Sequence, residues 1–247
     1  MLILFSPEYL QYTLLGIILL PGMIFAIITS AKVNSTFLKY NKVLSSKGYS
    51  ASDVVKKILE NEGVYDVEVI KSSNPELVDN YNPKTKTVTL SAKVFQSTSI
   101  AALGVAAHET GHAIQDAKGY APLKARNVLA TVGGVISTFV WPLILIGIIL
   151  DFAYVGGIVG KAFLWAGVGF FSISLIFSLI TLPVELDASK RALKLLVANG
   201  FVDEMEVKGA KKVLSAAAMT YVAAIVVSIL QLLRFVLFFL LNSRRSD

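Results

Sequence analysis

Four long apolar runs are the feature that most limits how this chain can fold. They cover residues 10–31, 128–150, 158–182 and 216–241, and each contains few charged side chains or none. About 20 consecutive apolar residues in a helix span the hydrocarbon core of a bilayer. Backbone polar groups in that core must be satisfied within the segment, which favours helices. The sequence therefore predicts an α-helical membrane protein with about four transmembrane helices.

Composition supports the same class of protein. Apolar residues make up 55% of the 247 residues, charged residues make up 16%, and the mean hydropathy is +0.67. A soluble domain carries about 25% charged residues, so this chain is expected to expose surface to lipid. The absence of cysteine excludes disulfides and cysteine-ligated metal sites. The chain has no basic low-complexity tail, so nucleic acid is not an expected partner.

Two polar segments, residues 32–126 and 183–215, are rich in Lys and Arg, whereas the loop 151–157 has neither. Positive residues favour the cytoplasmic side of a membrane. We therefore expect both polar segments in the cytoplasm and an uncleaved first span with its N-terminus outside. Arg244 and Arg245 point the other way, since four spans would place the C-terminus outside.

Local patterns in the first polar segment predict a small mixed α+β region. Ser52 is expected to cap a helix over residues 53–62 that Gly63 ends. Alternating side chains then predict short strands. These strands cover residues 64–70, 77–81 and 87–91, with a turn at 82–84. A further helix is expected to begin at Ser97 or Ser99 and to end at Gly119.

Local patterns in the second polar segment predict two short helices outside the membrane. Pro183 is expected to end the third span, and Gly200 is expected to end a separate helix over residues 184–199. Asp203 and Glu206 form a plausible capping pair for a helix over residues 204–214.

The sequence His108-Glu109-Thr110-Gly111-His112 lies within the helix predicted before Gly119. Histidines four residues apart on a helix share one face, where both imidazoles can bind one Zn²⁺. Glu109 lies beside them, at the position of a general base for a zinc-bound water. These are the only two histidines in the chain. The short pattern also occurs by chance, but the small residues around it would allow close packing of this helix.

A catalytic zinc ion commonly takes three protein ligands, and here the third must be a carboxylate. The second and third spans form a hairpin that returns the chain to the membrane face from which it left. Glu185 is the first acidic residue after that return. Asp187 is the nearest rival, and Asp116 is a weaker one because it lies on the same helix as His112.

Several longer motifs resemble the YugP-type neutral zinc metallopeptidases of bacterial membranes. They are Asn82-Pro83-Lys84-Thr85-Lys86-Thr87-Val88, Ala107-His108-Glu109-Thr110-Gly111-His112-Ala113-Ile114-Gln115, Leu182-Pro183-Val184-Glu185-Leu186-Asp187-Ala188-Ser189, and Thr220-Tyr221-Val222-Ala223-Ala224. The resemblance implies a gluzincin-like zinc-peptidase domain with ligands His108, His112 and Glu185 and with Glu109 as catalytic base. Many gluzincins have an Asp four residues after the ligand Glu. Ser189 occupies that position here, which leaves the partner of the ligand histidines open.

The remaining site residues are hypotheses about catalysis and binding. Tyr221 is the first choice for stabilising the oxyanion, with Tyr81, Tyr120 and Arg191 as alternatives. A peptide substrate could add to the edge of the strand formed by Thr87, Val88, Thr89 and Leu90. An ordinary edge strand kept soluble by nearby lysines would look the same.

The whole pattern predicts a zinc endopeptidase that cleaves membrane-associated proteins or peptides at the cytoplasmic face of the membrane. One alternative is a catalytically inactive zinc protein that serves as a membrane adaptor, although such a protein has no need of Glu109. A second alternative is a transporter component, which only the four spans and Arg234 suggest.

Overall fold

The computed structural model describes residues 14–73, 79–133 and 158–243. The chain divides into two compact units. One unit, which we call the polar unit, contains residues 29–125 and 181–220. The other, which we call the apolar unit, contains residues 1–28, 126–180 and 221–247.

Three long helices carry the apolar sequence. They are α2 (Leu20–Tyr40), preceded by the 3-10 turn η2 (Gly16–Leu19), α7 (Ile158–Ala198) and α8 (Glu206–Ser243). The described residues of each helix include a segment long and apolar enough to cross a membrane. The expected span at residues 128–150 lies largely outside the described residues, as do residues 10–13 of the first span.

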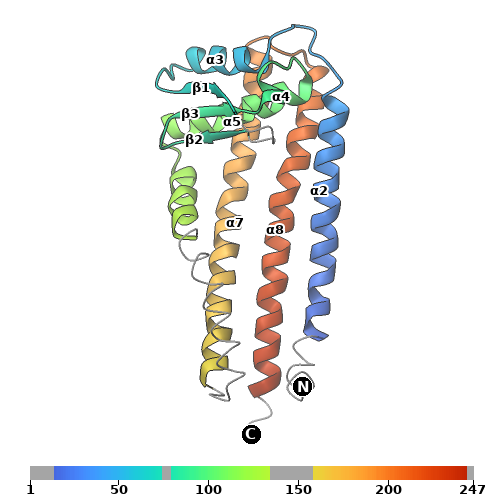
Figure 1. The fold of residues 1–247 in the computed structure, drawn as a ribbon, viewed down its shortest axis with the longest axis vertical. Helices are drawn as coiled ribbons and strands as arrows, with labels where there is room; N and C mark the ends of the chain where they lie inside the picture. The colour runs from blue at the N-terminus through green and yellow to red at the C-terminus, as the bar shows by residue number, and fades with distance from the viewer. Residues whose placement is uncertain (1–13, 74–78, 134–157, 244–247) are drawn as a thin grey trace. The chain divides into compact units, whose positions relative to one another are not determined.

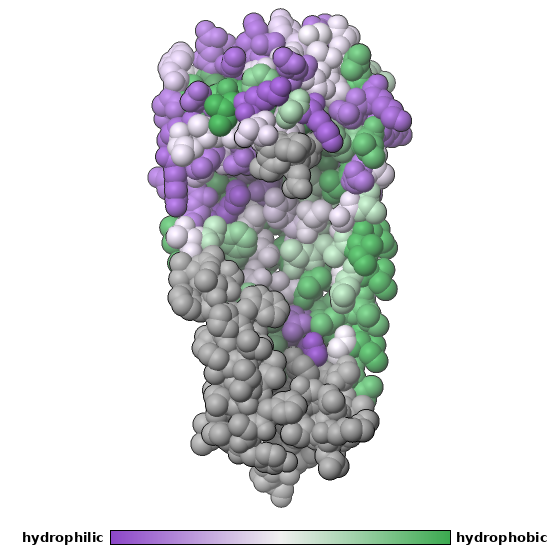
Figure 2. Space-filling model, in the orientation of Figure 1, coloured by the Kyte–Doolittle hydropathy of each residue, from purple (hydrophilic) through white to green (hydrophobic). Residues whose placement is uncertain are grey.

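Helix α2 exposes a series of large apolar side chains, as expected of a helix that faces lipid. Leu20, Met23, Ile24, Ile27 and Ile28 are each between 49 and 67% exposed. Figure 2 shows hydrophobic side chains along the α2 side of the molecule and hydrophilic ones around α3 and the strands. Exposed apolar side chains on a helix of this length agree with a position in a bilayer.

Two helix boundaries that we expected, one at Pro183 and one between residues 214 and 216, are wrong. Pro183 lies inside α7, so residues 184–198 continue the third apolar run instead of forming a separate helix. A proline removes one backbone donor, and neighbouring groups can satisfy the carbonyl that is left over. α8 likewise joins the helix expected at residues 204–214 to the last apolar run. Its predicted capping pair is confirmed, since Asp203 Oδ1 accepts from Glu206 N at 2.7 Å and Glu206 Oε2 accepts from Asp203 N at 3.0 Å.

A three-stranded sheet in the polar unit has the order β1-β3-β2 (Figure 1). β1 (Glu68–Lys71) runs parallel to β3 (Thr87–Leu90), and β2 (Asn80–Asn82) runs antiparallel to it. The turn between β2 and β3 forms where it was expected, and Asn82 Oδ1 accepts a hydrogen bond from Lys84 N at 2.9 Å. An asparagine in this position mimics a backbone turn.

The expected edge strand is instead the central strand of the sheet. β3 is paired on both sides, and its residues Val88 and Leu90 are fully buried. A peptide therefore cannot add to Thr87, Val88, Thr89 and Leu90 as we expected. The local alternation predicted the strand, but β1 pairs with it across a long connection that leaves no local signal. Among the described residues, the outer edges of β1 and β2 are the free edges of the sheet.

Two helices build the core of the polar unit against this sheet. α3 (Ala51–Asn61) and α5 (Ile100–Ala117) pack together, and the short α4 (Ala92–Phe95) lies between β3 and α5 in the chain. Ser99 Oγ caps α5 by accepting from Ala102 N at 3.2 Å, as expected. The cap of α3 is Ser50, not Ser52, because Ser52 is already buried within the first turn.

Helix α5 makes a backbone contact with α7 at Gly111. A Cβ atom added to Gly111 would lie 2.7 Å from the carbonyl oxygen of Ala188 and 3.1 Å from its Cα. Both atoms belong to backbone, so neither can move aside as a side chain would. Only glycine allows the two helices to approach this closely.

We expect Gly111→Ala to destabilise the protein by about 1–3 kcal/mol, the usual cost of overpacking a tight interior. The measurement is thermal unfolding of the full chain in detergent, followed by circular dichroism. Gly169→Ala is the matched control, because a Cβ at that helical glycine meets nothing within 4 Å. Equal melting temperatures for the two variants would show that the close contact does not exist.

Candidate metal centre

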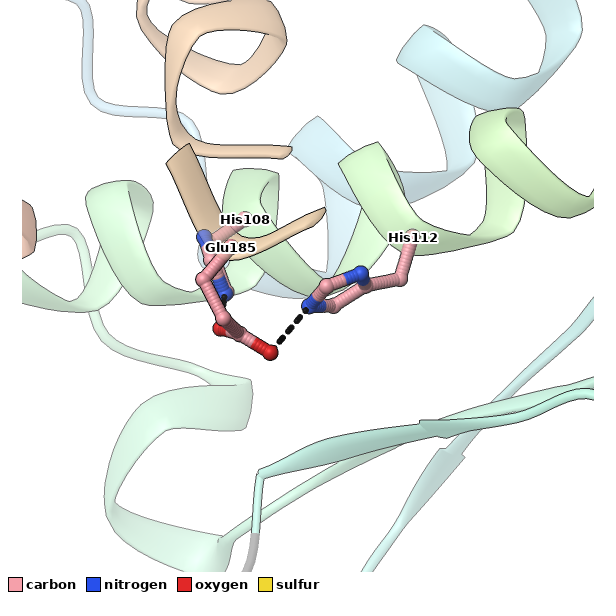
Figure 3. Close-up of side chains that lie close together, drawn as sticks. All are labelled: His108, His112 and Glu185. Carbon is pink, nitrogen blue, oxygen red and sulfur yellow. Dashed lines mark hydrogen bonds and ion pairs between the residues drawn. The ribbon is translucent and has the colours of Figure 1, made fainter. Parts of the chain in front are cut away.

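Helix α5 places His108 and His112 on one face, and α7 places Glu185 opposite them (Figure 3). His108 Nε2 lies 3.1 Å from Glu185 Oε2, and His112 Nε2 lies 3.5 Å from Glu185 Oε1. One potential ligand atom from each residue lies within 4.8 Å of the others. The close approach of α5 and α7 at Gly111 explains how a carboxylate 73 residues later in the chain reaches this helix.

The donor atoms of this group are those that a zinc ion takes. Both histidines turn Nε2 towards Glu185, because their Nδ1 atoms already have partners. Two imidazole nitrogens and a carboxylate form a common set of protein ligands for catalytic zinc. The three side chains are 14, 7 and 5% exposed, which leaves the site accessible mainly through His108. The three residues could therefore hold a metal ion.

The two rival carboxylates have other partners. Asp187 Oδ2 accepts from Gln115 Nε2 at 2.8 Å and from Arg191 Nε at 2.6 Å. Asp116 Oδ2 accepts from the Tyr81 hydroxyl at 2.8 Å and from Lys86 Nζ at 2.7 Å. Within the residues that the structure describes, the only such group of donors is His108, His112 and Glu185.

Two polar side chains orient the histidine rings. Ser189 Oγ lies 3.1 Å from His108 Nδ1, so the residue that stands in place of the gluzincin Asp is the partner of this ring. Gln115 Oε1 lies 2.9 Å from His112 Nδ1, while its Nε2 donates to the carbonyl of Val184 at 2.9 Å. Gln115 is completely buried, and its side-chain amide nitrogen bonds two residues of α7, Val184 and Asp187.

Sequence reasoning missed Gln115 as a site residue. The available signal was its spacing, because a residue three positions after His112 lies on the same helical face. A glutamine can also accept from a histidine and donate elsewhere at the same time. A ligand histidine almost always has such a partner on its other nitrogen.

Glu109 lies next to this group and contacts the sheet. Burial raises the pKa of Glu109 to about 7, although the charge of a protonated His108 acts in the opposite direction. Its Oε2 accepts a hydrogen bond from the backbone N–H of Tyr81 at 2.9 Å. A carboxyl group with a pKa near neutrality can both take up and release a proton.

The bond to Glu109 identifies which edge of the sheet faces the site. Because the N–H of Tyr81 points to Glu109, it points away from β3, and it lies on the free edge of β2. The hydroxyl of Tyr81 bonds Asp116 one turn beyond His112. Burial and the neighbouring Asp116 raise the pKa of Tyr81. Burial alone would raise the pKa of Asp116, but the hydrogen bonds from Lys86 and Tyr81 lower it. Tyr81 thus ties β2 to α5 at two points.

These contacts also bear on the proposed oxyanion donors. The Tyr81 hydroxyl bonds Asp116, and the Arg191 guanidinium bonds Asp187 and lies 6.0 Å from the Tyr120 ring centre. Tyr221 belongs to the apolar unit, so its role remains a prediction.

Comparison with known proteins agrees with this geometry. The model of the family described as "Putative neutral zinc metallopeptidase" matches residues 15–240. A relative from Bacillus subtilis (strain 168), described as "Putative membrane protease YugP", is 42% identical over 217 residues. The match covers 87% of this chain and 92% of the relative. No solved structure matches the chain. Because the family model covers nearly the whole sequence, the chain belongs to the family described as "Putative neutral zinc metallopeptidase".

Proposed function

We propose that the protein is a zinc-dependent endopeptidase with His108, His112 and Glu185 as metal ligands. The observation that carries the proposal is the convergence of two Nε2 atoms and one carboxylate beside Glu109. A purely structural zinc site usually has four protein ligands and no adjacent base. This argues against an inactive adaptor. The transporter alternative gains no support, because the ionisable side chains that meet here, those of His108, His112 and Glu185, are the donors of a metal site.

In the proposed mechanism, different residues of this chain act as metal ligands, general base and oxyanion donor. Zn²⁺ held by the three ligands would lower the pKa of a bound water and polarise the scissile carbonyl. Glu109 takes a proton from the attacking water and passes it to the leaving amine. We propose Tyr221 as the oxyanion donor because it begins the last apolar run on the expected cytoplasmic face, and Tyr120 stays an alternative. The Tyr81 hydroxyl and the Arg191 guanidinium are bonded to Asp116 and Asp187.

The free edge of β2 replaces β3 as the proposed substrate strand. The backbone of Tyr81 already faces Glu109, so an extended peptide on this edge would pass directly over the base. Main-chain hydrogen bonds to a strand edge read little side-chain sequence. We propose that the substrates are extended segments of membrane-associated proteins or peptides at the cytoplasmic face of the bacterial membrane. The two Lys- and Arg-rich segments support that side of the membrane.

We expect Glu109→Gln to retain bound zinc and to lower kcat/KM by about 10²–10⁴-fold, the usual contribution of a general base. The measurements are metal content by mass spectrometry and cleavage of an unfolded protein such as casein. The amide keeps the size of the side chain but cannot accept the proton. Wild-type cleavage by this variant would contradict the proposed mechanism.

We expect Glu185→Ala to lose zinc, because two histidine ligands alone hold the ion weakly. Metal content after dialysis is the measurement. Glu60→Ala is the matched control, since it removes an exposed carboxylate from α3, away from the site. Full zinc occupancy in Glu185→Ala would move the third ligand to another residue.

We expect Gln115→Ala and Ser189→Ala each to weaken zinc binding by about 10–100-fold, as loss of a ligand's hydrogen-bond partner commonly does. Ser189→Thr should keep most of the affinity because it keeps the hydroxyl group. Zinc affinity is measured by competition with a chelating dye. Unchanged affinity in both alanine variants would show that these side chains do not orient the histidines.

A further inference from the structure

A groove in the polar unit lies between the polar ends of α7 and α8. Its volume is about 850 Å³. Its apolar lining includes Leu186, Leu193, Val197 and Leu214. Leu186 is 49% exposed and Val197 is 36% exposed, so part of this lining faces outward. We call this feature the basic groove because of the charges that border it.

Four lysines border the basic groove. Lys190 and Lys194 are four residues apart on α7, and Lys208 and Lys211 are three residues apart on α8. Each spacing places two side chains on one helical face. All four are exposed, and in the described parts of the chain none of them forms an ion pair.

The negative charge near these lysines is small. Glu204 is the one acidic residue that lines the groove. Asp187 lies close to Lys190 in sequence, but it is paired with Arg191. Four lysines against one glutamate leave an excess of positive charge along an apolar cleft, and such a cleft attracts anions.

The groove begins where both helices change from apolar to polar sequence. The apolar run of α7 ends at Leu182, and that of α8 begins at Ala216. At 1.5 Å per helical residue, Lys190 lies about 12 Å beyond Leu182, and Lys211 lies about 8 Å before Ala216. The headgroup layer extends roughly 5–8 Å beyond the hydrocarbon core. Long lysine side chains bend towards that layer from this height.

We propose that the basic groove binds an anionic phospholipid, with its phosphate held by the lysines and one acyl chain along the apolar lining. An amphiphile with an anionic head matches both parts of the groove, and a bilayer supplies it at high local concentration. Basic sites of this kind beside cytoplasmic helix ends recognise anionic headgroups. Ser189, whose hydroxyl group bonds His108, also lines the groove.

The absence of cysteine makes a site-specific test possible. In the full chain, Val197→Cys carries one fluorophore and is reconstituted in phosphatidylcholine nanodiscs. The probes are phosphatidylglycerol and phosphatidylcholine, each brominated on its acyl chain to quench the fluorophore. We expect brominated phosphatidylglycerol to reach the same quenching as brominated phosphatidylcholine at a mole fraction lower by on the order of tenfold. Two or more lysines near a headgroup supply a preference of this size.

Charge-matched variants separate the groove from general attraction. Replacing Lys190, Lys194, Lys208 and Lys211 with Gln should abolish the preference for phosphatidylglycerol. Replacing four exposed lysines elsewhere in the polar unit with Gln should preserve it. These control positions are Lys47, Lys56, Lys57 and Lys71. The double variant Lys190→Gln, Lys194→Gln should lose part of the preference and provides the test if the fourfold variant does not fold.

Three results would overturn the proposal. Equal quenching by the two lipids would exclude an anionic lipid in the groove. Equal loss of the preference in the groove and control variants would show only general charge attraction. Displacement of the brominated lipid by a soluble acidic peptide, but not by unbrominated phosphatidylglycerol, would identify a protein partner instead. None of these results depends on peptidase activity.

Discussion

The contact between Gly111 and the backbone of Ala188 is the constraint on which the candidate site depends. A Cβ at this glycine would approach a carbonyl oxygen to 2.7 Å, so no other residue allows the two helices to meet there. The contact lies between the two histidines of α5 and one turn beyond Glu185 of α7. Helices that pack through larger side chains are separated by 8–10 Å. A closer approach allows one carboxylate to lie between both imidazoles.

A network of hydrogen bonds then fixes the directions of the side chains that the helices bring together. Gln115 links His112 to the backbone and to Asp187 of α7, while Ser189 bonds His108. Tyr81 connects the free edge of β2 to Glu109 and Asp116. Buried polar groups are costly unless they are satisfied, and a satisfied network favours one arrangement. The polar residues around the site therefore define its geometry as much as the apolar core does.

Helices α7 and α8 each combine an apolar part with a polar part in one unbroken element. Ala188, Ala192 and Leu196 of α7 are buried in the polar unit, and the segment long and apolar enough to cross a membrane covers Val168–Ala198 of the same helix. Along the sequence of α7, Glu185 and the residues of the basic groove follow within a few turns of Leu182, where the predicted span ends.

The sequence alone predicted much of this protein because its strongest signals are local. Apolar runs predicted long helices, serine caps and terminal glycines predicted the ends of α5, and the histidine spacing predicted the metal-binding face. The hairpin argument also selected Glu185, which the structure places beside both histidines, although its binding of zinc remains a proposal. Only the tertiary structure decided the central position of β3, the helix that continues through Pro183, and the groups of α7 that Gln115 bonds. Those features depend on which distant segments pair and pack, and such partners leave no periodic signal in the chain.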